Sequence, residues 1–216
     1  MNETVIVLVR HAESVKNLGD IHGGKGMQLT PKGREQCAIL VGKMKSWGIN
    51  KDNAVLLFSE SVQTKETAEL IEKQMGMPSE PIKGGATINL GVASGLSNDE
   101  VKHRFPEVYN NLVKWRNKEI EIADLHIPGM ESAEGFFNRG LTILSSVREN
   151  CYNIFVVTTS LFILLANILL GKTVRRSGGY KHMDVRNAEI ALFRGKYGDY
   201  AVDSVLTEVL DVLERQ

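Results

Sequence analysis

The chain has 216 residues, 43% hydrophobic and 24% charged, and its 26 basic residues balance its 26 acidic ones. This composition excludes a disordered or fibrous chain and is typical of one compact domain, residues 1–216, with a substantial core. A formal net charge of zero provides no global field that would attract nucleic acid or an anionic membrane. We therefore expect neither as a partner.

No segment has the pattern of a targeting or membrane-spanning sequence. The run before Arg10 is short, apolar and without a preceding basic stretch, which fits a strand better than a signal peptide. The more apolar run 154–170 is interrupted by polar residues, and a buried strand followed by a buried helix accounts for it better than a membrane span. Two unclustered cysteines, Cys37 and Cys151, favour a reducing compartment over a disulfide. We expect a cytoplasmic protein.

Strand and helix patterns alternate along the chain. The predicted strands are 4–9, 54–58, 154–158, and a hairpin of 189–194 with 200–202. The predicted helices are 30–47, 61–75, two short helices within 98–118 broken at Pro106, 131–150, 161–170 and 205–215. Segments 19–26 and 84–95 are expected to be loops. This order predicts an α/β fold of three layers, a mostly parallel central sheet with helices on both faces.

Ligands of such sheets bind beyond the carboxyl ends of the strands. Three places meet that description: Arg10-His11, Ser59 and Thr159-Ser160. A lone histidine is more often structural than nucleophilic. Here, however, a guanidinium and an imidazole meet at a strand end beside a glycine-rich loop, a combination suited to an oxyanion. The sequence therefore predicts an anion site at this edge.

Six segments carry motifs in a recognisable order: LVRHAESVKN, LTPKGREQC, SVQTKETAELI, PGMES, VVTTSLFILLANILLG and NAEIALF. They resemble the Arg-His-Gly signature and the later motifs of the histidine phosphatase (phosphoglycerate mutase-like) superfamily. The matches run from Val5 to Phe193, which makes them more specific than any single motif. The resemblance implies phosphoryl transfer through a phosphohistidine, with no metal and no other cofactor.

Transferred residue by residue, the resemblance implies a phosphate pocket that this chain retains only in part. His11 stands at the nucleophile position, Arg10 at the first arginine and Asn17 at the phosphate-loop asparagine. Three positions that are charged or titratable in the family are neutral here: Gln63 for the second arginine, Thr87 for the acid and Thr159 for the second histidine. The implied ligand-binding set is Arg10, His11, Asn17, Gly23, Gln63, Thr159 and Ser160.

The size of the expected loss argues against ordinary turnover. Removing one oxyanion donor costs about 10²–10³ in rate, and removing a general acid costs roughly 10²–10⁴. Because groups that act as a unit are not additive, the combined loss is nearer about 10⁶ than the full product. Ordinary phosphatase activity would not survive it.

Substitutes for the missing groups are present in two loops. The basic or titratable candidates are Lys16, His22, Lys25, Arg175, Lys181 and His182, with His182 in the role of the missing histidine. The alternative, which we favour, is that these side chains are solvated, since charged residues usually face water. Glu13 and Glu131 are candidates for the acid, although ion pairing with arginine explains them equally well.

Two classes of function remain open. The first, which we favour, is a degenerate family member that binds a phosphorylated or anionic small molecule, or a protein partner, with little or no phosphohydrolase activity. The second is an atypical phosphatase or phosphotransferase that still uses His11 as phosphoryl acceptor. Deliberate replacement of residues to trap a complex is a third hypothesis, and three separate changes favour natural divergence over it. A homodimer is compatible with each of these.

Overall fold

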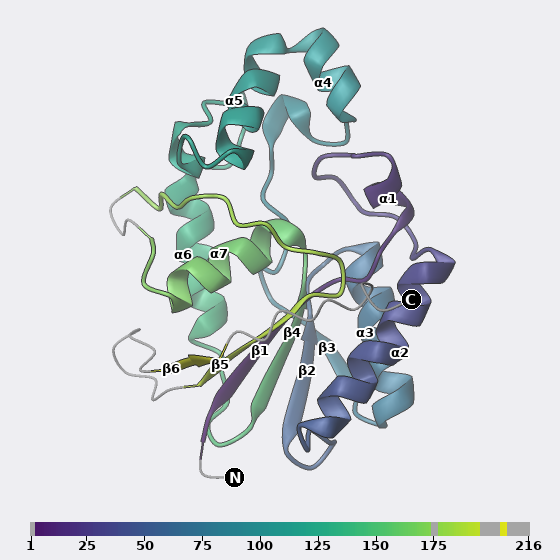
Figure 1. Ribbon diagram of the computed structural model, residues 1–216. Helices are drawn as coiled ribbons and strands as arrows, with labels where there is room; N and C mark the ends of the chain where they lie inside the picture. The colour runs from purple at the N-terminus through teal and green to yellow at the C-terminus, as the bar shows by residue number, and fades with distance from the viewer. Residues whose placement is uncertain (1–2, 174–176, 195–203, 207–216) are drawn as a thin grey trace.

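A six-stranded sheet forms the centre of the molecule, and its strands lie in the order β3-β2-β4-β1-β5-β6 (Figure 1). The computed structural model describes residues 3–173, 177–194 and 204–206. The strands are β1 Val5–Arg10, β2 Ala54–Phe58, β3 Ser79–Pro81, β4 Tyr152–Val157, β5 Ile190–Arg194 and β6 Ser204–Leu206. β3, β2, β4 and β1 run parallel, whereas β5 and β6 are antiparallel to their neighbours. The prediction of a mostly parallel sheet is confirmed.

Helices cover both faces of this sheet (Figure 1). They are α1 Val15–Leu18, α2 Pro31–Ser46, α3 Val62–Met75, α4 Asn98–Arg104, α5 Pro106–Arg116, α6 Ala133–Leu144 and α7 Thr159–Leu169, with short 3₁₀ turns at Gly91–Ala93 and Ile122–Asp124. Side chains of β1 alternate between the faces: Val7 packs in the cluster with α2 and α3, and Leu8 in the cluster with α6 and α7. Because both faces of β1 are buried, the strand is apolar from Val5 to Val9. The three-layer prediction is confirmed.

Two predicted helix starts have the expected caps. Thr30 caps α2 by accepting a hydrogen bond from the amide of Gly33, and Pro31 occupies the first helical position. Ser61 caps α3 in the same way through Thr64. These caps fix where each helix begins relative to the sheet, and so place the first turn of α3 beside the end of β1.

The region of α4 and α5, residues 98–116, lies beyond the carboxyl edge of the sheet and faces α1 (Figure 1). We call it the lid. The segment that leads into the lid is tied to the glycine-rich loop, because the amide of His22 donates to the carbonyl of Leu96 across 2.9 Å. The two segments therefore enclose space above the sheet edge from opposite sides.

Several predicted boundaries are wrong. α6 ends at Leu144 rather than near residue 150, because the hydroxyls of Ser145 and Ser146 bond back to helix carbonyls and compete with further helix. α1 and β3 were not predicted. Residues 204–206 form a strand rather than the start of a helix, since they pair with the edge of β5. The predicted strand 200–202 and the rest of the predicted helix 205–215 lie outside the described residues.

Within the described part of the chain, no helix is both long and apolar enough to cross a membrane. Cys37 and Cys151 are both free thiols. Burial raises the pKa of Cys37 to about 12, so this thiol stays protonated and unreactive at neutral pH.

Candidate active site

A cavity of about 270 Å³ opens at the carboxyl edge of the sheet. Its floor comes from the end of β1, the glycine-rich loop and the first turns of α3 and α7, and its roof comes from the lid. The floor contains nearly all the residues that the sequence assigned to a phosphate pocket: Arg10, His11, Asn17, Gly23, Gln63, Thr87, Thr159 and Ser160. Segments separated by about 150 residues in sequence thus meet in one place.

His11 is held in one defined tautomer. Its side chain is 3% exposed, and its Nδ1 lies 2.8 Å from the carbonyl oxygen of Ala12. A carbonyl only accepts, so Nδ1 carries the proton and Nε2 keeps its lone pair. Burial, assisted by the charge of Arg10, lowers the pKa of His11 to about 3. The ring is therefore neutral at physiological pH, as a nucleophile must be.

Arg10 places a guanidinium beside that ring. Its Nη1 donates to the carbonyl of Val185, and its Nε is buried without a partner among the described residues. Burial lowers the pKa of Arg10 to about 10, against the opposing effect of Glu189, so the group stays charged at neutral pH. The unpaired N–H groups of Arg10 are able to donate hydrogen bonds to an oxyanion.

Asn17 and Gln63 contribute neutral amides. The Oδ1 atom of Asn17 accepts from both the amide and the hydroxyl of Ser14, each at 2.9 Å, which leaves its Nδ2 as donor for a ligand. The Oε1 atom of Gln63 accepts from the amide of Met27 at 3.3 Å. Gly26 is required here: its φ is +90°, and a Cβ would lie 1.9 Å from Gln63 Oε1. The glycine-rich loop therefore packs directly on Gln63.

The start of α7 forms the third side of the floor. Thr158 is its N-cap residue, and Thr159 and Ser160 open the helix. The first amides of an α-helix have no partner within it and carry partial positive charge, which favours an anion. The hydroxyl of Ser160 lies 2.8 Å from that of Thr87 and accepts from the amide of Ile88 at 3.3 Å. This corner offers hydroxyls and amides but no titratable group.

The roof includes a charged residue, Arg116, that was not among the predicted site residues. Asn98 Oδ1 accepts from His22 Nε2 at 3.0 Å and from Arg116 Nη2 at 3.1 Å. His182 contacts Trp115 edge-on, with ring centroids 4.6 Å apart. Burial lowers the pKa of both histidines, and the charge of Arg116 lowers it further. Arg116 thus lies in electrostatic range of two imidazoles from different segments.

Not every proposed substitute reaches the cavity. His22, His182 and Lys16 line it. Lys25 is exposed and does not line it, and Lys181 instead donates to the carbonyl of Glu119 at 3.2 Å. For Lys25 and Lys181 the structure therefore matches the favoured alternative, a side chain in contact with solvent. Arg175 lies outside the described residues.

The proposed replacement acids also lie elsewhere. Glu13 pairs with Lys32 at 3.3 Å, and Glu131 pairs with Arg139 at 2.8 Å. Among the described residues, Asp20 is the only carboxylate that lines the cavity. No sequence signal separates Asp20 from the other acidic residues of the chain.

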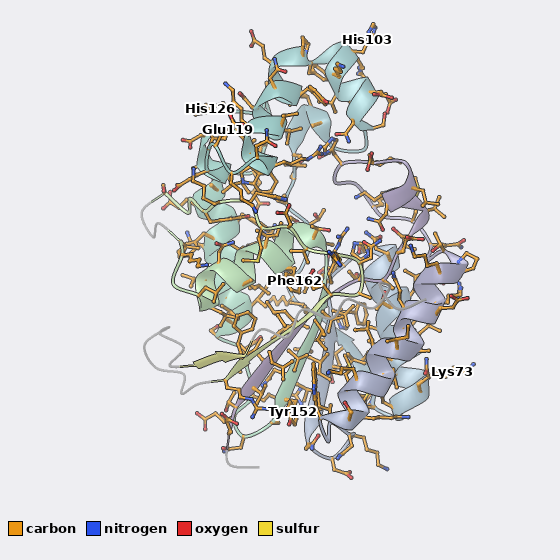
Figure 2. The ribbon with its side chains drawn as sticks, viewed as in Figure 1. Lys73, His103, Glu119, His126, Tyr152 and Phe162 are labelled. Atoms are coloured by element: carbon orange, nitrogen blue, oxygen red, sulfur yellow. The ribbon has the colours of Figure 1, made fainter. Side chains whose placement is uncertain are left out.

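Two further histidines, one in the lid and one after it, lie away from the cavity. Figure 2 shows His103 and His126 on the outer side of the molecule, pointing away from the sheet edge. Both are exposed. Neither enters the cavity, in line with the absence of any motif around them.

The model of the histidine phosphatase superfamily (branch 1) matches residues 6–206. The chain belongs to this superfamily. Curated relatives of this superfamily member include 2,3-bisphosphoglycerate-dependent phosphoglycerate mutases from Bradyrhizobium sp. (strain ORS 278) and Afipia carboxidovorans, each 30% identical over 145 residues. Each match covers 65% of this chain and 66% of the relative, so it spans just under two thirds of the length of those mutases.

Solved structures share the fold of this superfamily member at low identity. Bacillus stearothermophilus YhfR superposes with a TM-score of 0.74 at 18% identity, covering 95% of this chain and 96% of that one. A mycobacterial glucosyl-3-phosphoglycerate phosphatase superposes with a TM-score of 0.72 at 17% identity, covering 95% and 97%. A putative α-ribazole-5′-P phosphatase from Escherichia coli gives 0.72 at 19%, covering 97% and 96%. These likenesses establish the fold.

Proposed function

We propose that this histidine phosphatase superfamily member binds a phosphorylated small molecule in the cavity and hydrolyses it slowly or not at all. The observation that carries the proposal is the composition of the floor. The guanidinium of Arg10 and the start of α7 are present to hold an anion, whereas Gln63, Thr87 and Thr159 are neutral. The names of the relatives, mutases and phosphatases of phosphate esters, support the same ligand class.

Binding and turnover depend differently on these groups. A phosphate in the ground state needs donors, and Arg10, Asn17 and the α7 amides provide them. Breaking the ester also requires a proton for the leaving oxygen and further positive charge on the transferring phosphoryl group. Hydroxyls such as those of Thr87 and Thr159 donate hydrogen bonds but do not release a proton to an alkoxide at neutral pH. The floor therefore favours holding an ester over cleaving it.

A second candidate function rests on the tautomer of His11. Because Nδ1 is bonded to Ala12, the free Nε2 is able to attack phosphorus. In that step an N–P bond forms, the ester O–P bond breaks, and the alcohol leaves with a proton from another group. Asp20 and His22 line the cavity and are candidates for the source of that proton. The protein would then be an atypical phosphatase or phosphotransferase.

Two substrates with different leaving groups separate the candidates. p-Nitrophenol leaves as a stable anion without protonation, whereas a simple alcohol requires an acid. The proposal predicts phosphate binding by calorimetry, weak cleavage at most of p-nitrophenyl phosphate, and no measurable cleavage of an alkyl phosphate. Rapid cleavage of the alkyl phosphate that disappears in His11→Ala, with phosphohistidine detected by intact mass, would contradict the proposal and establish the second function.

A further inference from the structure

Lys16 is a cation of the cavity to which the family motifs assign no role. It lies in α1, is half-buried, and lines the same cavity as Arg10 and His11. Its Nζ donates to the carbonyl of Gly23, which draws the ammonium toward the glycine-rich loop. No carboxylate forms an ion pair with Lys16 among the residues that the structure describes.

Neighbouring lysines behave differently. Lys25, in the same loop, is exposed and does not line the cavity. Lys32, at the start of α2, pairs with Glu13 at 3.3 Å. Lys16 differs from both because it lines the cavity and has no carboxylate partner among the described residues. An ordinary surface lysine would instead extend into solvent.

Lys16, Arg10 and the neutral ring of His11 affect one another electrostatically. The positive charge of Arg10 lowers the pKa of Lys16, after the larger effect of burial, and Lys16 in turn contributes to the lowered pKa of His11. Two partly desolvated cations beside one neutral imidazole repel each other unless an anion lies between them. Among the described residues, Glu189 is the carboxylate whose negative charge raises the pKa of Arg10.

We infer that Lys16 is a second phosphate-binding cation of this cavity, and that Lys16 and Arg10 together select a dianionic phosphate monoester over a monoanionic diester. This inference rests on the proposed function. Gln63 is neutral and contributes no charge to the floor, so Lys16 supplies the second full positive charge there. Two full cations match the two negative charges that a monoester carries above its second pKa, near about 6.

The test is an NMR titration of the whole protein with methyl phosphate and, separately, dimethyl phosphate, at about pH 8, where the monoester is a dianion. The wild type is expected to bind methyl phosphate and to show no saturable shifts with dimethyl phosphate. Lys16→Gln should weaken methyl phosphate by about 10- to 100-fold, the loss of one charge-assisted hydrogen bond. Lys16→Arg should retain most of the affinity, since it keeps the charge.

Lys25→Gln is the matched control, because it removes the same net charge from an exposed site in the glycine-rich loop that follows α1. It should change the dissociation constant by no more than about twofold, since exposed charges are screened. Equal effects of Lys16→Gln and Lys25→Gln, or equal binding of the two esters, would overturn the inference. If Arg10→Ala still abolishes binding in that case, the proposed function stands without it. No binding of either ester by the wild type would overturn both.

Discussion

Thr87 and Ser160 share a hydrogen bond, with their hydroxyl oxygens 2.8 Å apart at the edge of the cavity floor. The family resemblance places a carboxylic acid at position 87, and this pair occupies its place with two neutral groups. Since Ser160 also accepts from the amide of Ile88, the pair holds the loop after β3 against the start of α7. The floor therefore has no acid at position 87 that would protonate the leaving group.

Restoring an acid at this position should restore part of the chemistry. Thr87→Glu is expected to raise cleavage of an alkyl phosphate by about 10²-fold or more, the usual contribution of a general acid. Cleavage of p-nitrophenyl phosphate should change far less, because its leaving group needs no proton. Steady-state assays of both esters check this, with Thr87→Gln as the isosteric control that cannot donate a proton in this way. Equal stimulation of both esters by Glu and Gln would show that position 87 has no acid role.

Charge restored to the other two neutral positions should tighten anion binding. Gln63→Arg with Thr159→His is expected to lower the dissociation constant for inorganic phosphate by about tenfold or more, since charge-assisted hydrogen bonds are the stronger kind. Arg10→Ala should remove most of the remaining affinity in either background. Calorimetry measures both effects. A folded double variant that binds no phosphate would mean that the cavity does not accept it, and the function would then lie on the outer surface.

The buried neutral His11 makes the folded protein sensitive to acid. The pKa of His11 is lowered to about 3 in the folded state, so below about pH 6.5 only the unfolded chain takes up this proton. Its contribution to stability is complete above that unfolded pKa and is lost as pH falls toward 3. Between about pH 6.5 and 5 the free energy of unfolding should fall by about 1.6 kcal/mol.

Urea denaturation of wild type and His11→Gln at both pH values isolates this contribution. His22 and His182 shift in the same direction and remain in both proteins, so the difference between the two pH dependences belongs to His11. The variant should lose less stability than the wild type on acidification. Identical pH dependences would mean that His11 is not buried in its neutral form.

Arg116 should control the titration of two histidines from different segments. Its charge lowers the pKa of both His22 and His182, whereas that of Lys118 lowers the pKa of His182. Arg116→Gln is therefore expected to raise both pKa values. Lys118→Gln serves as the control and should raise that of His182 while leaving His22 unchanged. Histidine NMR titrations report both, and a His22 pKa that is unaffected by Arg116→Gln would contradict the arrangement of the roof.

Local patterns were enough to predict most of the sheet and to locate its ligand-binding edge, whereas the family resemblance supplied the assignments of Asn17, Gln63 and Thr87. Strands such as 54–58 are continuous apolar runs, and Thr30 and Ser61 are capping residues that fix helix starts by interactions within four residues. Arg10 ends β1 and His11 follows it, so the rule that ligands bind at the carboxyl ends of strands located both residues without a structure. These features depend on neighbours in the chain, which the sequence displays.

The roof of the cavity and the choice among basic residues were decided by tertiary structure. Lys16, in α1, and Lys25, in the glycine-rich loop, lie nine positions apart, yet of these two only Lys16 lines the cavity. Arg116 meets His22 through Asn98 only when the lid packs across the sheet edge. Which side chains interact electrostatically in the cavity depends on contacts between segments about 75 to 100 residues apart in sequence. Those contacts arise when whole helices and strands pack together, and no local sequence pattern displays them.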